Sequence, residues 1–212
     1  MTFNPLILRR YFVLGTQNVE NESQFFDILT TALKYGITAF QYREKGDGAL
    51  KGAEKYRVAE RVRDLTRQYH VPLIIDDDIP LAHQIHADGV HFGQKDGNII
   101  ENVRACNGMF VGVSVTTQAD FHRVQGVSGI DYIGVGPIFA TKTKADANPP
   151  IGLEGLSDIK RISHWPIVAI GGISNENIDD IYTTGINGVA VISMISAADN
   201  VAEAVIKWQQ YS

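Results

Sequence analysis

The chain has 212 residues, of which 44% are hydrophobic, and a formal net charge of −5. The acidic balance and the lack of a basic run argue against nucleic acid or an anionic membrane as the main partner, and the single cysteine excludes an intrachain disulfide. No segment approaches the roughly 20 apolar residues of a membrane span, so we expect one cytoplasmic domain over residues 1–212, with residues 1–9 as a short N-terminal extension and a homo-oligomer left open.

Short apolar segments recur along the chain, each rich in Val, Ile, Phe or Tyr and bounded by Gly, Pro or Asp. Most are continuous apolar runs, which is the pattern expected of parallel strands covered on both faces. The eight predicted strands cover residues 10–15, 39–45, 72–76, 89–94, 109–115, 132–139, 166–172 and 188–195.

Helical periodicity fills the intervals between these strands. The three clearest apolar stripes consist of Phe25, Ile28, Leu29, Ala32 and Leu33, then Val58, Val62, Leu65 and Tyr69, and finally Val201, Val205 and Trp208. Gly36 and Gly185 stand where helix C-caps belong, just before a new strand. The helices after the third, fourth and fifth strands are expected to be short.

Eight strand–helix units in one chain predict a single-domain α/β fold, the (β/α)₈ or TIM barrel. The competing fold is a doubly wound open sheet, but the first strand–helix turn lacks the Gly-rich dinucleotide fingerprint. In a barrel the chemistry belongs to the loops that follow the strands. The polar residues of this chain are concentrated there.

The loops after the seventh and eighth strands predict a phosphate site. Gly171 and Gly172 let the backbone approach a ligand closely, and Ile192 and Ser193 follow the eighth strand. These are the two loops that hold phosphate in many barrels. The alternative is a pair of tight turns without a ligand.

Acidic residues follow the third and fourth strands, where the chain reads LIIDDDIPLA and then GQKD. Asp77 and Asp96 end neighbouring strands, so they can converge on one Mg²⁺, although two ordinary surface aspartates remain the alternative. Asp78 precedes Ile79 and Pro80 and suits the N-cap of the next helix.

Basic residues complete the pattern. Strand alternation puts Arg43 and Lys45 on the same side of the second strand, and Lys142 and Lys144 lie in the loop after the sixth. Cations facing two carboxylates suit a metal-bound polyphosphate, and the alternative for the later loop is a solvated segment. His91 is expected to be a satisfied strand residue. These residues predict an Mg²⁺-dependent barrel with a phosphate site and a diphosphate site.

A set of motifs in this order resembles the thiamine-phosphate synthase family. The motifs are FQYREK, DDDIPLAHQIHADGVHFGQKD, VGVSV, DYIGVGPIFATKTK, PIVAIGGIS and GVAVIS. The resemblance extends from about Tyr11 to Ser196. It implies an enzyme that joins a hydroxymethylpyrimidine diphosphate to a thiazole phosphate and releases pyrophosphate.

The resemblance also implies roles for individual residues. Arg43, Lys45, Ser114 and Lys144 are the expected catalytic residues, and Asp77 and Asp96 are expected to bind one Mg²⁺. The expected contacts of the pyrimidine diphosphate are Gln41, Tyr42, Arg43, Glu44, Lys45, Asp76, Ser114 and Lys144. The expected contacts of the thiazole phosphate are Thr141, Lys142, Thr143, Gly172, Ile192 and Ser193.

Asp76 departs from the family, which usually has Asn at this position. Three readings stay open: a third metal ligand, a site tuned to another substrate, or a weakened paralogue. A lesser departure is Ala140, where the family commonly has Pro. The alternative functions are a thiazole-phosphate tautomerase and a non-catalytic binding protein for thiamine precursors. The tautomerase is disfavoured by retention of the residues expected to hold the diphosphate and its metal, which are Arg43, Lys45, Asp77, Asp96 and Lys144.

Overall fold

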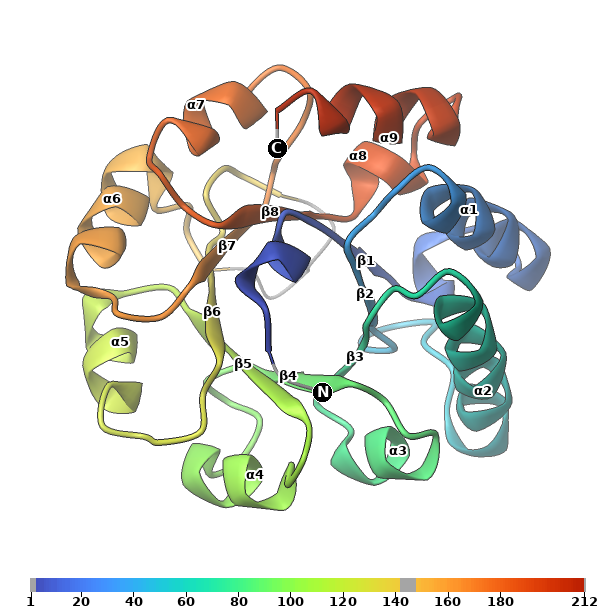
Figure 1. The fold of residues 1–212 in the computed structure, drawn as a ribbon, viewed down its shortest axis with the longest axis horizontal. Coiled ribbons are helices and arrows are strands. Elements are labelled where there is room, and N and C mark those ends of the chain that lie inside the picture. Colours follow the sequence, from blue (N-terminus) through green and yellow to red (C-terminus); the bar gives the residue numbers. More distant parts are fainter. Residues whose placement is uncertain (1–2, 142–147, 212) are drawn as a thin grey trace.

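The fold is a closed barrel of eight parallel strands in chain order, seen in a computed structural model that describes residues 3–141 and 148–211. The first strand closes the barrel by pairing with the last, so that Phe12 lies beside both Phe40 and Val191. This pairing makes the alternative of an open sheet wrong. Figure 1 looks along the barrel, with the strands in an inner ring and the helices outside it.

All eight predicted strands are present, and each lies within its expected segment. They are β1 Arg10–Leu14, β2 Ala39–Tyr42, β3 Leu73–Asp76, β4 Gly89–Phe92, β5 Phe110–Val115, β6 Tyr132–Val135, β7 Ile167–Ile170 and β8 Gly188–Val191. Several end before the expected segment does, because regular pairing stops at the rim of the barrel: β2 is paired on both sides only as far as Tyr42.

Helices follow the strands and pack around them. They are α1 Glu22–Lys34, α2 Gly52–Gln68, α3 Ile79–Gln84, α4 Ile99–Ala105, α5 Gln118–Val124, α6 Gly152–Ile162, α7 Ile178–Tyr182, α8 Ser193–Ser196 and α9 Val201–Gln209, with short 3₁₀ turns η1 Pro5–Leu8 and η2 Thr16–Asn18. Gly36 and Gly185 follow α1 and α7 with positive φ, as expected of C-cap glycines. Within residues 3–141 and 148–211, no helix has the length and apolar character to cross a membrane.

Two apolar layers hold the barrel together. The larger one fills the space between strands and helices, and the smaller one, which includes Tyr11, Ile74 and Tyr132, lies inside the barrel. The turn η1 occupies the middle of the ring at the end where the strands begin (Figure 1), and Phe3 stacks on Tyr132 with 5.8 Å between ring centroids. This end is therefore closed by apolar groups, and the opposite end is left for a site.

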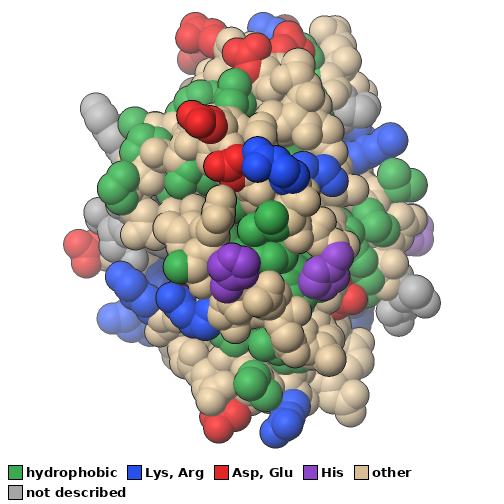
Figure 2. Space-filling model, turned by 90° about the vertical axis from the view of Figure 1, so that its left-hand side faces the viewer, with side chains coloured by type: hydrophobic (Ala, Val, Ile, Leu, Met, Phe, Trp, Pro, Cys, Tyr) green, Lys and Arg blue, Asp and Glu red, His purple; other side chains and the backbone are tan. Residues whose placement is uncertain are grey.

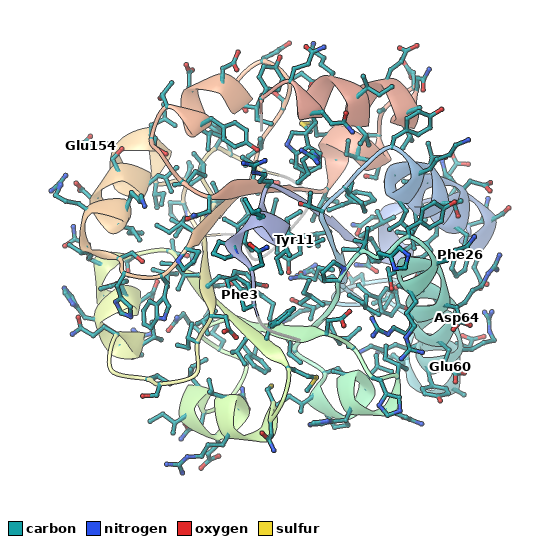
Figure 3. The ribbon with its side chains drawn as sticks, viewed as in Figure 1. Phe3, Tyr11, Phe26, Glu60, Asp64 and Glu154 are labelled. Atoms are coloured by element: carbon teal, nitrogen blue, oxygen red, sulfur yellow. The ribbon has the colours of Figure 1, made fainter. Side chains whose placement is uncertain are left out.

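The outer surface carries charges of both signs. Figure 2 views the side of α5, α6 and α7, where acidic and basic side chains are interspersed with small hydrophobic groups. Figure 3 shows the contrast within one view: Phe3 and Tyr11 lie inside the ring of strands, whereas Glu60, Asp64 and Glu154 lie outside it. This mixed surface is typical of a solvated helical layer.

Asp78 caps α3, as the sequence predicts. Its carboxylate accepts a hydrogen bond from the backbone N–H of Leu81 at 3.1 Å, and it also pairs with Lys55 Nζ at 2.7 Å. Pro80 sits in the first turn, where a missing N–H costs nothing. Asp78 thus has a local structural role.

We expect Asp78→Ala to lower the free energy of unfolding by about 1 kcal/mol, the usual effect of losing a helix N-cap. Asp78→Asn retains a capping oxygen and loses only the charge towards Lys55, so its loss should be smaller. Urea unfolding of both variants measures the difference. An equal loss in both would assign the stability to the ion pair instead of the cap.

Candidate active site

A cavity opens at the end of the barrel where the strands finish. Its walls come from each of the eight strands or from the loop that follows it. The polar side chains that line it are Tyr11, Gln41, Arg43, Lys45, Asp76, His91, Asp96, Ser114, Thr116, Thr141 and Asn148. Five side chains predicted for the pyrimidine diphosphate are therefore brought together: Gln41, Arg43, Lys45, Asp76 and Ser114.

Residues 41–45 alternate between two environments. Gln41, Arg43 and Lys45 line the cavity, as strand alternation predicts. Tyr42 faces the opposite way and packs in the outer core, with its ring 6.0 Å from that of Phe25. Glu44 also faces away from the cavity.

Glu44 fastens the loops after β1 and β2 to each other. Its carboxylate accepts hydrogen bonds from Thr16 N at 2.7 Å, Thr16 Oγ1 at 3.0 Å and Leu50 N at 2.8 Å. Alternation puts Tyr42 and Glu44 on the helix side of the barrel, so neither lines the cavity, and their expected contacts with substrate stay predictions. Glu44 instead fixes the backbone from which Arg43 and Lys45 project.

Lys45 lies between the two carboxylates predicted to bind a metal. Its ammonium donates to Asp96 Oδ1 at 2.7 Å and also to Asp77. Burial opposes the charge on Lys45, but these two carboxylates outweigh it and raise its pKa above the ordinary value. Burial also raises the pKa of Asp77, whereas for Asp96 the hydrogen bonds outweigh burial and lower the pKa.

The pair of carboxylates fits a divalent cation. Asp77 and Asp96 already converge on one positive charge, and Asp77 Oδ1 is buried without a hydrogen-bond partner in the part of the chain that the structure describes. Asp77 also has a φ of +61°, unusual for a residue with a side chain and common at functional sites. Among the described residues no group of three or more His, Cys, Asp or Glu is arranged to hold a metal.

Asp76 forms an ion pair with Arg43. Its Oδ2 lies 3.4 Å from Arg43 Nε, and both side chains are largely buried. Burial, together with the charge of Asp77, raises the pKa of Asp76 to about 7. The sequence did not explain this residue, and the structure assigns it an ion-pair partner within the cavity.

Asp76 should make the stability of the metal-free protein depend on pH. A carboxyl group whose folded pKa is raised binds its proton more tightly in the folded state, so stability falls as the pH rises from about 4 to about 7. In EDTA, the free energy of unfolding of Asp76→Asn should exceed that of the parent by an amount that grows over this range to about 2–4 kcal/mol. Urea unfolding at several pH values measures this, with exposed Asp158→Asn as the control, and parallel curves for parent and Asp76→Asn would contradict it.

The loops after β7 and β8 form a second, smaller cavity beside the first. It is lined by Thr141 and by the four residues whose loops predict a phosphate site, which are Gly171, Gly172, Ile192 and Ser193. The segment after β6 packs directly on the glycines, with Phe139 N donating to Gly171 O at 3.0 Å. A Cβ on Gly172 would lie 2.5 Å from Ala140 O, so this loop has room only for glycine.

Some predicted residues cannot be placed, and some lining residues were not predicted. Lys142, Thr143 and Lys144 lie outside the described residues. Sequence reasoning missed Tyr11, His91, Thr116 and Asn148, which also line the first cavity. The position of His91 in the predicted strand 89–94 could have indicated its place in the cavity. Side chains alternate along a strand, and those that point inward near the end of a barrel strand face the site.

Comparison with known proteins agrees with this geometry. Residues 10–195 match the family model described as thiamine monophosphate synthase. The chain belongs to the thiamine-phosphate synthase family. A relative named thiamine-phosphate synthase from Leuconostoc citreum is 54% identical over 209 residues, covering 99% of each chain. Another of that name, from Staphylococcus saprophyticus, is 40% identical and covers 98% of each.

Solved structures place the thiamine-phosphate synthase family in the same fold. A thiamine phosphate pyrophosphorylase from Pyrococcus furiosus is 31% identical, has a TM-score of 0.86 and covers 98% of this chain and 97% of its own. A 3-hexulose-6-phosphate synthase has a TM-score of 0.73 at 16% identity, with 95% and 99% coverage, which shows the shared barrel alone. Family membership, as implied by the resemblance of the motifs, is confirmed.

Proposed function

We propose that the protein is a thiamine-phosphate synthase that joins 4-amino-5-hydroxymethyl-2-methylpyrimidine diphosphate to hydroxyethylthiazole phosphate. The products are thiamine phosphate and pyrophosphate. The observation that carries the proposal is a shared wall: Thr141, Gly171 and Ile192 line both the cavity with Arg43 and Lys45 and the cavity of the glycine loop. Two phosphorylated substrates bound in these cavities would meet there.

The reaction needs positioned charge more than it needs a protein nucleophile. The bond between the pyrimidine methylene carbon and the diphosphate oxygen breaks, and pyrophosphate leaves with the electron pair. The thiazole nitrogen then uses its lone pair to form the new carbon–nitrogen bond. Arg43 and Lys45 project into the cavity where negative charge develops on the leaving group, which is electrostatic stabilisation of the transition state.

Asp77 and Asp96 are the residues that would hold Mg²⁺, and Asp77 Oδ1, which is buried with no hydrogen-bond partner among the described residues, supports this. A Mg²⁺ held there would supply positive charge to a diphosphate leaving group. The carboxylates also hold the ammonium of Lys45 in place. Glu44, which precedes Lys45, supports the same arrangement by accepting hydrogen bonds from Thr16 N in the loop after β1 and from Leu50 N in the loop after β2.

The direct test is an assay of thiamine phosphate formed from both phosphorylated precursors and Mg²⁺, with each precursor omitted in turn as the control. We expect product only when both precursors are present. No product, together with tight binding of the thiazole phosphate alone, would favour a tautomerase-like enzyme or a binding protein. We also propose that residues 1–212 form one cytoplasmic domain that acts on small phosphorylated substrates and has no nucleic-acid or membrane partner.

A further inference from the structure

A chain of hydrogen-bonded side chains crosses the inside of the barrel. Gln41 Nε2 donates to Tyr11 Oη at 2.8 Å, and Tyr11 Oη lies 2.9 Å from Tyr132 Oη. Tyr132 Oη lies 3.2 Å from Nδ1 of His91, and Nε2 of His91 lies 2.9 Å from Ser114 Oγ. The two ends, Gln41 and Ser114, both line the cavity.

The strands make room for this chain with two inward glycines. Gly112 on β5 pairs with His91 on one side and Tyr132 on the other. A Cβ on Gly112 would lie 2.2 Å from Tyr132 Cζ and 2.5 Å from His91 Nδ1. Gly134 on β6 is similarly close, since its Cβ would lie 3.0 Å from His91 Cε1. The absence of these side chains lets two rings from different strands meet.

Either hydroxyl of the Tyr11–Tyr132 pair can be the donor, and the roles of the His91 nitrogens depend on its tautomer, but proton counting favours one direction. Gln41 Nε2 can only donate, so Tyr11 Oη accepts from it and has its own proton for Tyr132. Tyr132 then has its proton for Nδ1 of His91, which places the imidazole proton on Nε2, facing Ser114. Burial raises the pKa of both tyrosines far above the ordinary value, so each keeps the proton that this count requires.

We infer that Tyr11, Tyr132 and His91 are positioning residues that fix the Ser114 hydroxyl as a hydrogen-bond donor to the substrate. Ser114 Oγ accepts from His91, so its own proton is left for a ligand in the cavity. The ligand must then present an acceptor to Ser114, such as a ring nitrogen. The link to a pyrimidine substrate rests on the proposed function, whereas the direction of these side-chain hydrogen bonds does not.

The first test reads the tautomer of His91 in the ligand-free protein at mildly alkaline pH. Nitrogen-15 NMR distinguishes a proton on Nε2 from one on Nδ1, and loss of one signal in His91→Gln identifies this residue among the six histidines. We expect the Nε2–H form. An Nδ1–H form or an imidazolium would overturn the inference, and this result needs no turnover, so it stands apart from the proposed function.

The second test removes the donor to Nδ1. Tyr132→Phe should shift His91 towards the Nδ1–H form and lower kcat/KM for the pyrimidine diphosphate by about 10–100-fold, with KM for the thiazole phosphate unchanged. Tyr182→Phe is the matched control, because it also deletes one hydroxyl hydrogen bond, to Arg9 O at 2.9 Å, but on the outer surface. It should change neither the tautomer nor the kinetics.

Two results of the second test would overturn the inference. One is an unchanged His91 tautomer in folded Tyr132→Phe. The other is an equal rise of KM for both substrates, which would indicate a general loss of packing. If Tyr132→Phe does not fold, the tautomer of the parent protein decides the question by itself.

Discussion

Asp96→Ala should lower kcat for thiamine phosphate formation by about a hundredfold or more, a loss similar to that of other electrostatic groups that act on the transition state. Asp96 is one of two carboxylates that hold Lys45 and fit a divalent cation, with its Oδ1 2.7 Å from Lys45 Nζ. Alanine would remove the proposed metal ligand and leave the ammonium of Lys45 with Asp77 alone. Steady-state kinetics at several Mg²⁺ concentrations measures both effects.

Two controls separate chemistry from folding in this experiment. Asp96 Oδ2 also accepts from Gly93 N at 2.8 Å, so Asp96→Asn retains an oxygen for that hydrogen bond while losing the charge. Asp158→Ala, which breaks an exposed ion pair with Arg161, should leave activity unchanged. Undiminished turnover of the parent protein in EDTA would reject the metal assignment.

Gly172→Ala should raise KM for the thiazole phosphate by about 10–100-fold while leaving the affinity for the pyrimidine diphosphate nearly unchanged. Gly172 has a φ of +66°, and an added Cβ would lie 2.5 Å from Ala140 O and 2.8 Å from Phe139 C. Backbone atoms cannot move as a flexible side chain can, so the loop must shift. Kinetics with each substrate varied in turn measures the split.

Gly108→Ala is the matched control for the backbone conformation. Gly108 has a φ of +84°, but an added Cβ would meet nothing within 4 Å. Its replacement should therefore cause the strain of a left-handed residue, about 1–2 kcal/mol, without changing either KM. A similar change of KM in both variants would contradict a role for Gly172 in phosphate binding.

The barrel could be predicted from sequence because its signals are local. Short runs rich in β-branched residues alternate with amphipathic helices, and these runs predict the number of strands. The C-cap glycines Gly36 and Gly185 mark where α1 and α7 end. The position of Arg43 and Lys45 on one side followed from alternation. Asp78 as a cap followed from its place before Ile79 and Pro80.

The rest of the site depends on contacts that no local pattern encodes. Tyr42 and Glu44 stand inside the motif that carries the resemblance, but Tyr42 packs in the outer core and Glu44 bonds Thr16 and Leu50. The partner of Asp76, Arg43, lies just after the neighbouring strand β2. His91 meets Tyr132 only because Gly112 lies between them, and that meeting depends on three strands at once.

The alternation of residues 41–45 has a consequence for how this segment can vary in length. Odd positions face the cavity, whereas Tyr42 faces the outer core and Glu44 fastens Thr16 and Leu50. One inserted or deleted residue would exchange the two faces, burying Arg43 and Lys45 against the helices and turning Tyr42 into the cavity. Active variants of this protein should therefore differ within residues 41–45 by substitution, and not by insertion or deletion.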